Sequence, residues 1–108
     1  MVVRMWRGWT APGNAGAYES VLREEVLPEI AAAAGGGFRG AELLRRDAGG
    51  EVEFVTLFRF DSLDTVRRLA GDDYEIAYVP AAARAVLARF EETAAHFETR
   101  PLPAGSPR

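Results

Sequence analysis

The chain of 108 residues contains no cysteine and no lysine, and its only histidine is His96. The absence of cysteine excludes disulfides, thiolate nucleophiles and cysteine-ligated metal sites. A lone histidine is also a poor basis for a transition-metal site. We therefore expect a protein that uses neither a metal ion nor another cofactor.

Long apolar runs and clusters of positive charge are missing as well. No run approaches the roughly 20 apolar residues of a membrane span, and Arg4 and Arg7 interrupt any apolar stretch of a signal peptide. The net charge is -3, and acidic and basic residues are interspersed, so no basic stripe favours nucleic acid or an anionic membrane. We expect a cytoplasmic protein with neither nucleic acid nor a membrane as a partner.

The hydrophobic content of 48% is ample for the core of one domain. We place this single domain at residues 1–100. Residues 101–108 (PLPAGSPR) are rich in proline, glycine and serine, and we expect them to form a flexible tail.

The segment 51–60 (EVEFVTLFRF) predicts a strand that is apolar on both faces, because successive side chains alternate across a strand. One face carries Val52, Phe54, Thr56, Phe58 and Phe60, and the other carries Glu53, Val55, Leu57 and Arg59. A chain this short has helices enough to cover one face. The second face predicts a homodimer, with two sheets packed against each other and counter-charges for Glu53 and Arg59.

Periodicity and turn residues predict the remaining elements. Strands are expected at 2–10, 38–46, 51–60 and 93–100, and helices at 17–30, 63–70 and 81–89. Pro28 is expected to kink the first helix, Ser62 to cap the second, and residues 47–50 to form a hairpin turn. This order is that of a ferredoxin-like βαββαβ fold, an α+β class with a four-stranded antiparallel sheet and helices on one face.

Short segments along almost the whole chain resemble one known group of proteins. They are residues 4–8 (RMWRG), 43–46 (LLRR), 51–54 (EVEF), 60–62 (FDS), 70–72 (AGD) and 96–98 (HFE). Together they are similar to the antibiotic biosynthesis monooxygenase-like superfamily of dimeric α+β barrels. This resemblance implies a ligand cavity between sheet and helices, and oxygenation of an aromatic or quinol-type compound without metal or flavin. Haem degradation is not expected, because the Asn of the first strand and the helix His used by such relatives are absent.

His96, Tyr78 and Arg59 are the candidates for catalytic residues. Histidine titrates near neutral pH and can act as a general base toward a phenol or quinol. Tyr78 lies in an irregular stretch that could cover a cavity. One of the arginines on predicted strands, Arg4, Arg7 or Arg59, could polarise a carbonyl or bind an anion, and Arg59 is the preferred candidate of the three. Each also has a structural alternative, which is a hydrogen-bonded histidine, a surface phenol and an ion pair, respectively.

Five aromatic residues are candidates for the wall of a cavity that takes a flat ligand, namely Trp6, Trp9, Tyr74, Phe58 and Phe60. Trp6 and Trp9 point to opposite faces of a regular strand, so one can line the cavity while the other packs at the dimer interface or the rim. Core packing is the alternative for both. The function expected from these residues is that of a cofactor-independent monooxygenase. The alternatives are a non-catalytic or stress-related dimer that binds a small molecule, and a structural module.

Overall fold

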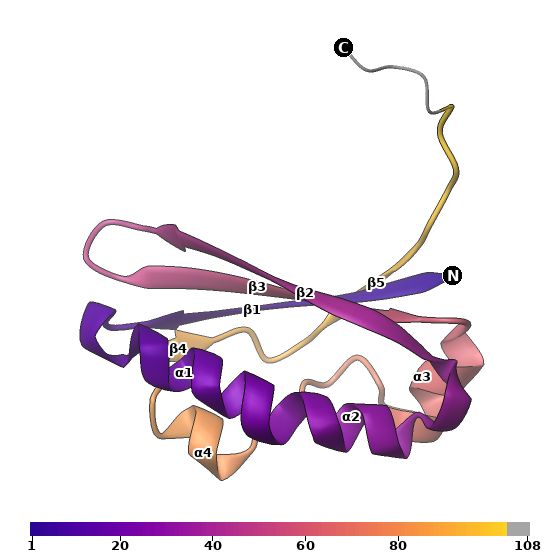
Figure 1. The fold of residues 1–108 in the computed structure, drawn as a ribbon, viewed down its shortest axis with the longest axis horizontal. Helices are drawn as coiled ribbons and strands as arrows, with labels where there is room; N and C mark the ends of the chain where they lie inside the picture. The colour runs from indigo at the N-terminus through magenta and orange to yellow at the C-terminus, as the bar shows by residue number, and fades with distance from the viewer. Residues whose placement is uncertain (104–108) are drawn as a thin grey trace.

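The computed structural model describes residues 1–103, in which one antiparallel sheet carries helices on a single face (Figure 1). The strands are β1 (Val2–Thr10), β2 (Phe38–Asp47), β3 (Val52–Phe60), β4 (Arg89–Phe90) and β5 (Ala95–Glu98). Their order is β2-β3-β1-β4, and β5 also pairs with β1. The predicted ferredoxin-like α+β fold is confirmed, with its fourth strand divided into β4 and β5. Of the tail predicted at 101–108, residues 104–108 lie outside the described residues.

The register between β1 and β3 decides which side chains face the helices. Val2 lies opposite Phe60, and Thr10 opposite Val52. Since side chains of paired residues point to the same face, the even-numbered positions of both strands form the inner face. The odd-numbered positions form the outer face, which no helix covers in Figure 1. The two faces predicted for the third strand are therefore confirmed.

The long helix under the sheet is built from three consecutive segments, α1 (Ala15–Val21), η2 (Leu22–Val26) and α2 (Leu27–Ala33). The middle segment is a π turn, in which the Leu27 N–H donates to the Leu22 carbonyl. Pro28 is the second residue after it, in the first turn of α2. Proline has no N–H and its ring crowds the carbonyl of the preceding turn, and a widened turn accommodates both. The disturbance expected at Pro28 thus takes the form of a π turn.

The second helix, α3 (Leu63–Ala70), has the predicted bounds. Ser62 caps it by accepting a hydrogen bond from the Thr65 N–H at 3.3 Å. Thr65 in turn donates from Oγ1 to Asp61 Oδ1 at 2.5 Å, and the Asp61 N–H donates to the Gly37 carbonyl at 2.9 Å. This network ties the start of α3 to the short 3-10 segment η3 (Gly35–Gly37) that precedes β2.

Gly37 has no room for a side chain at this junction. A Cβ atom there would lie 2.6 Å from both Thr65 Cγ2 and Thr65 Oγ1, and 2.9 Å from Asp61 Oδ1. We expect Gly37→Ala to lower the free energy of unfolding by about 1–3 kcal/mol, because the Thr65–Asp61 hydrogen bond must give way. Gly36→Ala is the matched control, since apart from its chain neighbours no described residue has an atom within 4 Å of its Cβ position. Urea unfolding measures both, and equal stabilities would contradict this packing.

The last third of the chain differs most from the prediction. The helix expected at 81–89 is wrong beyond its first turn, because α4 spans only Ala81–Arg84 and Arg89 begins β4. Residues 88–91 instead pair with the free edge of β1. The Ala88 N–H donates to the Trp9 carbonyl at 2.8 Å, and the Glu91 N–H to the Arg7 carbonyl at 3.0 Å. Long-range strand pairing here overrides the helix propensity of alanine.

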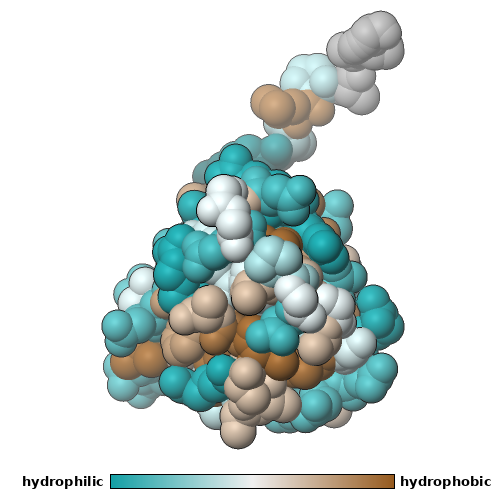
Figure 2. Space-filling model, turned by 90° about the vertical axis from the view of Figure 1, so that its left-hand side faces the viewer, coloured by the Kyte–Doolittle hydropathy of each residue, from teal (hydrophilic) through white to brown (hydrophobic). Residues whose placement is uncertain are grey.

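The buried side chains form two clusters between sheet and helices. Tyr18, Leu22 and Phe54 belong to the first, and Phe60 and Val66 to the second. Viewed from one end, hydrophilic side chains cover the upper part at the height of the strands, and hydrophobic ones gather lower down, at the height of the helices (Figure 2). Within residues 1–103, no helix is long and apolar enough to span a membrane, and no three metal-ligating side chains cluster.

Candidate functional site

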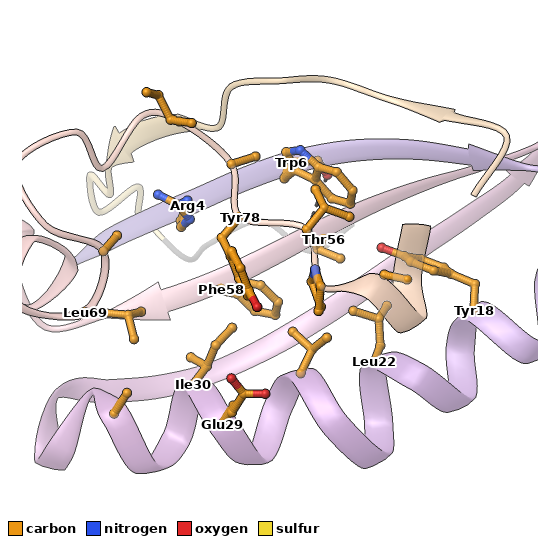
Figure 3. Close-up of a pocket in the computed structure, with 18 residues that line it drawn as sticks. Arg4, Trp6, Tyr18, Leu22, Glu29, Ile30, Thr56, Phe58, Leu69 and Tyr78 are labelled. Atoms are coloured by element: carbon orange, nitrogen blue, oxygen red, sulfur yellow. Dashed lines mark hydrogen bonds between the residues drawn. The ribbon is translucent and has the colours of Figure 1, made fainter. Parts of the chain in front are cut away.

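A cavity of 460 Å³ lies between the inner sheet face and the long helix (Figure 3). Its volume falls in the range of small-molecule sites, about 300–1,000 Å³. The sheet contributes Arg4, Trp6, Thr56 and Phe58. The long helix contributes Tyr18, Leu22, Val26, Glu29, Ile30 and Ala33, and α3 and the chain that follows it contribute Leu69, Ala70, Ile76, Ala77, Tyr78, Val79, Pro80 and Ala83. The wall is mainly apolar, with a few polar groups at defined places.

Arg4 is the cation of this wall. It extends from the inner face of β1, opposite Phe58 on β3 and His96 on β5. Its Nη1 donates to the Tyr74 carbonyl at 2.5 Å and to His96 Nε2 at 2.8 Å. Burial lowers the pKa of Arg4 from its ordinary value. The guanidinium remains charged at neutral pH, because arginine side chains are not deprotonated in proteins.

His96 lies behind Arg4 and outside the cavity wall. Because a guanidinium only donates, His96 Nε2 must accept the hydrogen bond, and the proton of the neutral ring resides on Nδ1. Burial lowers the pKa of His96, the nearby charge of Arg4 lowers it further, and Glu75 opposes both. The ring is therefore neutral at pH 7. Its Nδ1 is buried and has no hydrogen-bond partner among the described residues, and its ring meets that of Tyr74 edge-on at 5.1 Å.

Trp6 and Tyr18 give the cavity two fixed aromatic walls. Trp6 Nε1 donates to the Glu91 carbonyl at 2.6 Å, which leaves the ring surface apolar. Tyr18 is buried on α1, and its ring centroid lies 4.9 Å from that of Phe54. Burial raises the pKa of the Tyr18 phenol far above its ordinary value. The phenol is therefore neutral and offers a hydroxyl without charge.

The mouth of the cavity lies under the chain that follows α3. Tyr78 is 79% exposed there although it lines the cavity. The segment is held on both sides of Ile76, since the Ala77 N–H donates to the Glu92 carbonyl at 2.9 Å and the Ala94 N–H to the Glu75 carbonyl at 2.8 Å. Its backbone is thus held against the chain before β5, while the Tyr78 side chain remains largely exposed.

The structure gathers some of the predicted site residues and separates others. Tyr78, Trp6 and Phe58 line the cavity. Tyr74 and His96 lie behind Arg4 and contact it. The proposed catalytic roles of His96 and Tyr78 stay predictions.

Three of the predicted site residues lie away from the cavity. Phe60 is fully buried in the second cluster, beside Phe38 and Val66. Trp9 occupies the outer face of the sheet, where the Arg89 guanidinium lies 3.9 Å from its ring centroid. Arg59 is also on the outer face and pairs with Glu42, which is the ion pair considered as its alternative.

Among the strand arginines Arg4, Arg7 and Arg59, sequence reasoning favoured Arg59, whereas it is Arg4 that lines the cavity, and it missed Tyr18 as a residue of the cavity. A signal for Arg4 was present, because alternation along β1 places it on the same face as Trp6. For Tyr18 the spacing on the helix indicated an inward position. Nothing in the sequence showed that it faces a cavity rather than solid core.

The charges of the outer face are paired within the chain. Glu53 is only 5% exposed there, with Arg46 Nε at 2.7 Å and Arg7 Nη1 at 3.5 Å. Together with the Arg59–Glu42 pair, this supplies the counter-charges expected for Glu53 and Arg59. The remaining large side chains of this face are apolar, namely Val3, Met5, Trp9, Leu44, Val55, Leu57 and Phe97.

Comparison with known proteins shows the fold of the chain. SnoaB, a cofactor-independent oxygenase from Streptomyces nogalater, matches with a TM-score of 0.64 and 20% identity, over 96% of this chain and 98% of that chain. Protein Atu4242 from Agrobacterium tumefaciens matches with a TM-score of 0.61 and 19% identity, over 96% of this chain and 98% of that chain. Rv0793 from Mycobacterium tuberculosis matches with a TM-score of 0.55 and 23% identity, over 97% of this chain and 98% of that chain. No family model and no curated protein matches the chain. The resemblance indicated by the sequence is confirmed at the level of the fold.

Proposed function

We propose that this chain is a cofactor-independent monooxygenase that acts on an aromatic or quinol-type small molecule. The observation that carries the proposal is the cavity of 460 Å³, which the aromatic side chains of Trp6, Tyr18, Phe58 and Tyr78 line together with Arg4. SnoaB, a cofactor-independent oxygenase, has the same fold over nearly its whole length. Fold alone does not fix function, so the proposal depends on the shape and chemistry of this site.

Oxygenation without a cofactor requires the substrate itself to supply the electrons. An anthrone-type methylene can do so, because CH₂ and O₂ balance to C=O and H₂O, with four electrons leaving the carbon and four reducing the oxygen. The protein then has to bind a flat electron-rich ring, keep bulk water away from it and hold its developing negative charge. The apolar wall and Arg4 suit these tasks.

The direct test is oxygen uptake by the pure protein with a panel of anthrones and hydroquinones. We expect an initial rate at least about tenfold above uncatalysed autoxidation, which is about 1.4 kcal/mol of barrier lowering. Ala77→Trp should return the rate to background, because Ala77 lines the cavity and an indole would fill it. Ala81→Trp is the matched control, since Ala81 is exposed at the start of α4.

Two outcomes would count against the monooxygenase. One is no uptake above background across the panel. The other is equal uptake by wild type and Ala77→Trp, which would place the reaction outside the cavity. If quinols raise the melting temperature without oxygen uptake, the alternative of a non-catalytic binding protein is favoured, because a ligand that binds only the folded state must stabilise it.

We further propose that a second copy of the chain covers the outer sheet face and makes the protein a homodimer. The support is chemical, since this face is apolar and its charges are already paired within the chain. Leu44 and Phe97 on it are 48% and 52% exposed in the single chain. Apolar side chains gathered on one sheet face beside internally paired charges are characteristic of an interaction surface, and an identical sheet can match this face around a two-fold axis.

A further inference from the structure

Arg4 differs from the other arginines of residues 1–103 because it is partly buried without a carboxylate. The arginines within 4.0 Å of an Asp or Glu oxygen are Arg7, Arg23, Arg39, Arg45, Arg46, Arg59, Arg67, Arg89 and Arg100. Of those without one in this part of the chain, Arg68 and Arg84 are exposed, whereas Arg4 is half-buried in the cavity wall. A guanidinium removed from water costs free energy unless an anion compensates it.

The partners that Arg4 does have are both neutral, and both hold the same nitrogen. The Tyr74 carbonyl and His96 Nε2 accept from Nη1, so they orient the side chain and leave its charge uncompensated. Among the described residues, Nε and Nη2 have no acceptor. These two nitrogens form one edge of the planar guanidinium, which matches the two oxygens of a carboxylate. The site therefore presents an oriented cation with one free edge.

The rest of the cavity restricts what can accompany an anionic group. Trp6 and Phe58 flank Arg4 on the sheet, and apolar side chains of the long helix face them. The other ionised group of the wall is Glu29, on α2. A second negative group placed toward the helix would meet the Glu29 carboxylate, so a ligand with a single charge fits best.

We propose that the cavity binds a monoanionic, otherwise apolar aromatic compound, with its carboxylate or ionised phenol on the free edge of Arg4, and that His96 is the positioning residue for Arg4. This assignment deepens the proposed function, since an ionised phenol is the electron-rich form of such a ring that can react with O₂. It rests on the same cavity as the proposed function but not on turnover. Binding and oxygen uptake can therefore be tested separately.

The experiment compares three probes of nearly equal shape by calorimetry, which are 2-naphthoate, 2-naphthamide and 2-naphthylmethanol. Wild type is expected to bind naphthoate at least about tenfold more tightly than either neutral probe, as a charge-assisted bidentate contact requires. Arg4→Met should remove this preference and bind all three probes within about threefold of one another. Equal affinities in wild type, a preference for a neutral probe, or no naphthoate binding at millimolar concentration would overturn the proposal.

Variants of His96 test its positioning role with the same probes. His96→Leu removes the acceptor, so naphthoate affinity should fall about threefold to tenfold while the amide affinity stays unchanged. His96→Gln keeps an acceptor oxygen and should restore most of the naphthoate affinity. A purely structural histidine would instead weaken both probes equally in His96→Leu. Should Arg4→Met fail to fold, the wild-type preference for naphthoate decides the question by itself.

The possible results keep this inference apart from the oxygenase proposal. A naphthoate preference without any oxygen uptake supports an anion-binding cavity and rejects the oxygenase. Oxygen uptake that is equally fast for ionised and non-ionisable substrates, with no naphthoate preference, supports the oxygenase and rejects the anion site.

Discussion

A Leu57→Glu variant is expected to be monomeric at concentrations at which the proposed homodimer of the wild-type chain forms. Leu57 lies on β3, an inner strand of the sheet, and its side chain is on the outer face opposite Met5. In a symmetric sheet-to-sheet dimer the substitution buries two carboxylates, one from each copy. Arg59, two residues along the same face of β3, is already paired with Glu42, and Glu42 itself lies opposite Leu57 on β2, so the new carboxylates have no partner.

The cost of such unpaired interfacial charges is about 2–5 kcal/mol, which raises the dissociation constant by a factor of roughly 30 to several thousand. Light scattering after size exclusion at micromolar concentration measures the change. Ala32→Glu is the matched control, because it adds the same charge on an exposed position of α2. Circular dichroism must show that Leu57→Glu still folds. A wild-type chain that is already monomeric, or a Leu57→Glu variant that remains dimeric, would contradict the interface.

Truncation of Phe54 is expected to remove a large part of the stability of the fold. Its side chain is 1% exposed and packs on Tyr18, with ring centroids 4.9 Å apart. Phe54→Ala should lower the free energy of unfolding by about 3–5 kcal/mol, because it loses both the buried ring and the packing around it. The free energy of unfolding of a small domain is only about 5–15 kcal/mol in total. For a domain of this size the melting temperature should fall by about 4–8 °C for each kcal/mol of stability lost.

Thermal and urea unfolding measure this loss, and Leu102→Ala provides the control. Leu102 is 86% exposed, and its truncation should change stability by less than about 0.5 kcal/mol. If Phe54→Ala cost no more than this control, Phe54 would not be part of a tightly packed core. Because Phe54 does not line the cavity, ligand binding by the folded fraction should survive, which separates stability from function.

Local patterns predicted much of this fold. The bounds of β1 followed from apolar alternation, and those of α3 followed from the Ser62 cap. Both signals could be recognised because each involves only residues close together in the chain. The β2–β3 hairpin was also local, since Gly49 and Gly50 adopt the positive φ angles, 66° and 92°, that the turn requires. The end of the segment 81–89, beyond α4, was predicted wrongly because its backbone partner, β1, is some 80 residues away along the chain.

The residues of the candidate site could also be predicted only as far as local patterns reach. Alternation correctly divided Trp6 from Trp9 and Phe58 from Arg59, and it already placed Arg59 on the face predicted to meet a partner. Alternation within each strand did not show which face of β1 continues which face of β3, so the sequence did not assign Arg4 and Arg59 to opposite sides of the sheet. In the structure Val3 lies opposite Arg59, so Arg4 is one position away and faces the other side of the sheet.

The sequence by itself determined that the third strand is apolar on both faces, because side-chain alternation is a property of the extended backbone alone. Only the tertiary structure decided which face meets the helices and encloses a cavity. That choice depends on how far the long helix stands from the sheet, and on where β5 places His96 beside Arg4. Such distances arise from packing between segments that are remote in the chain.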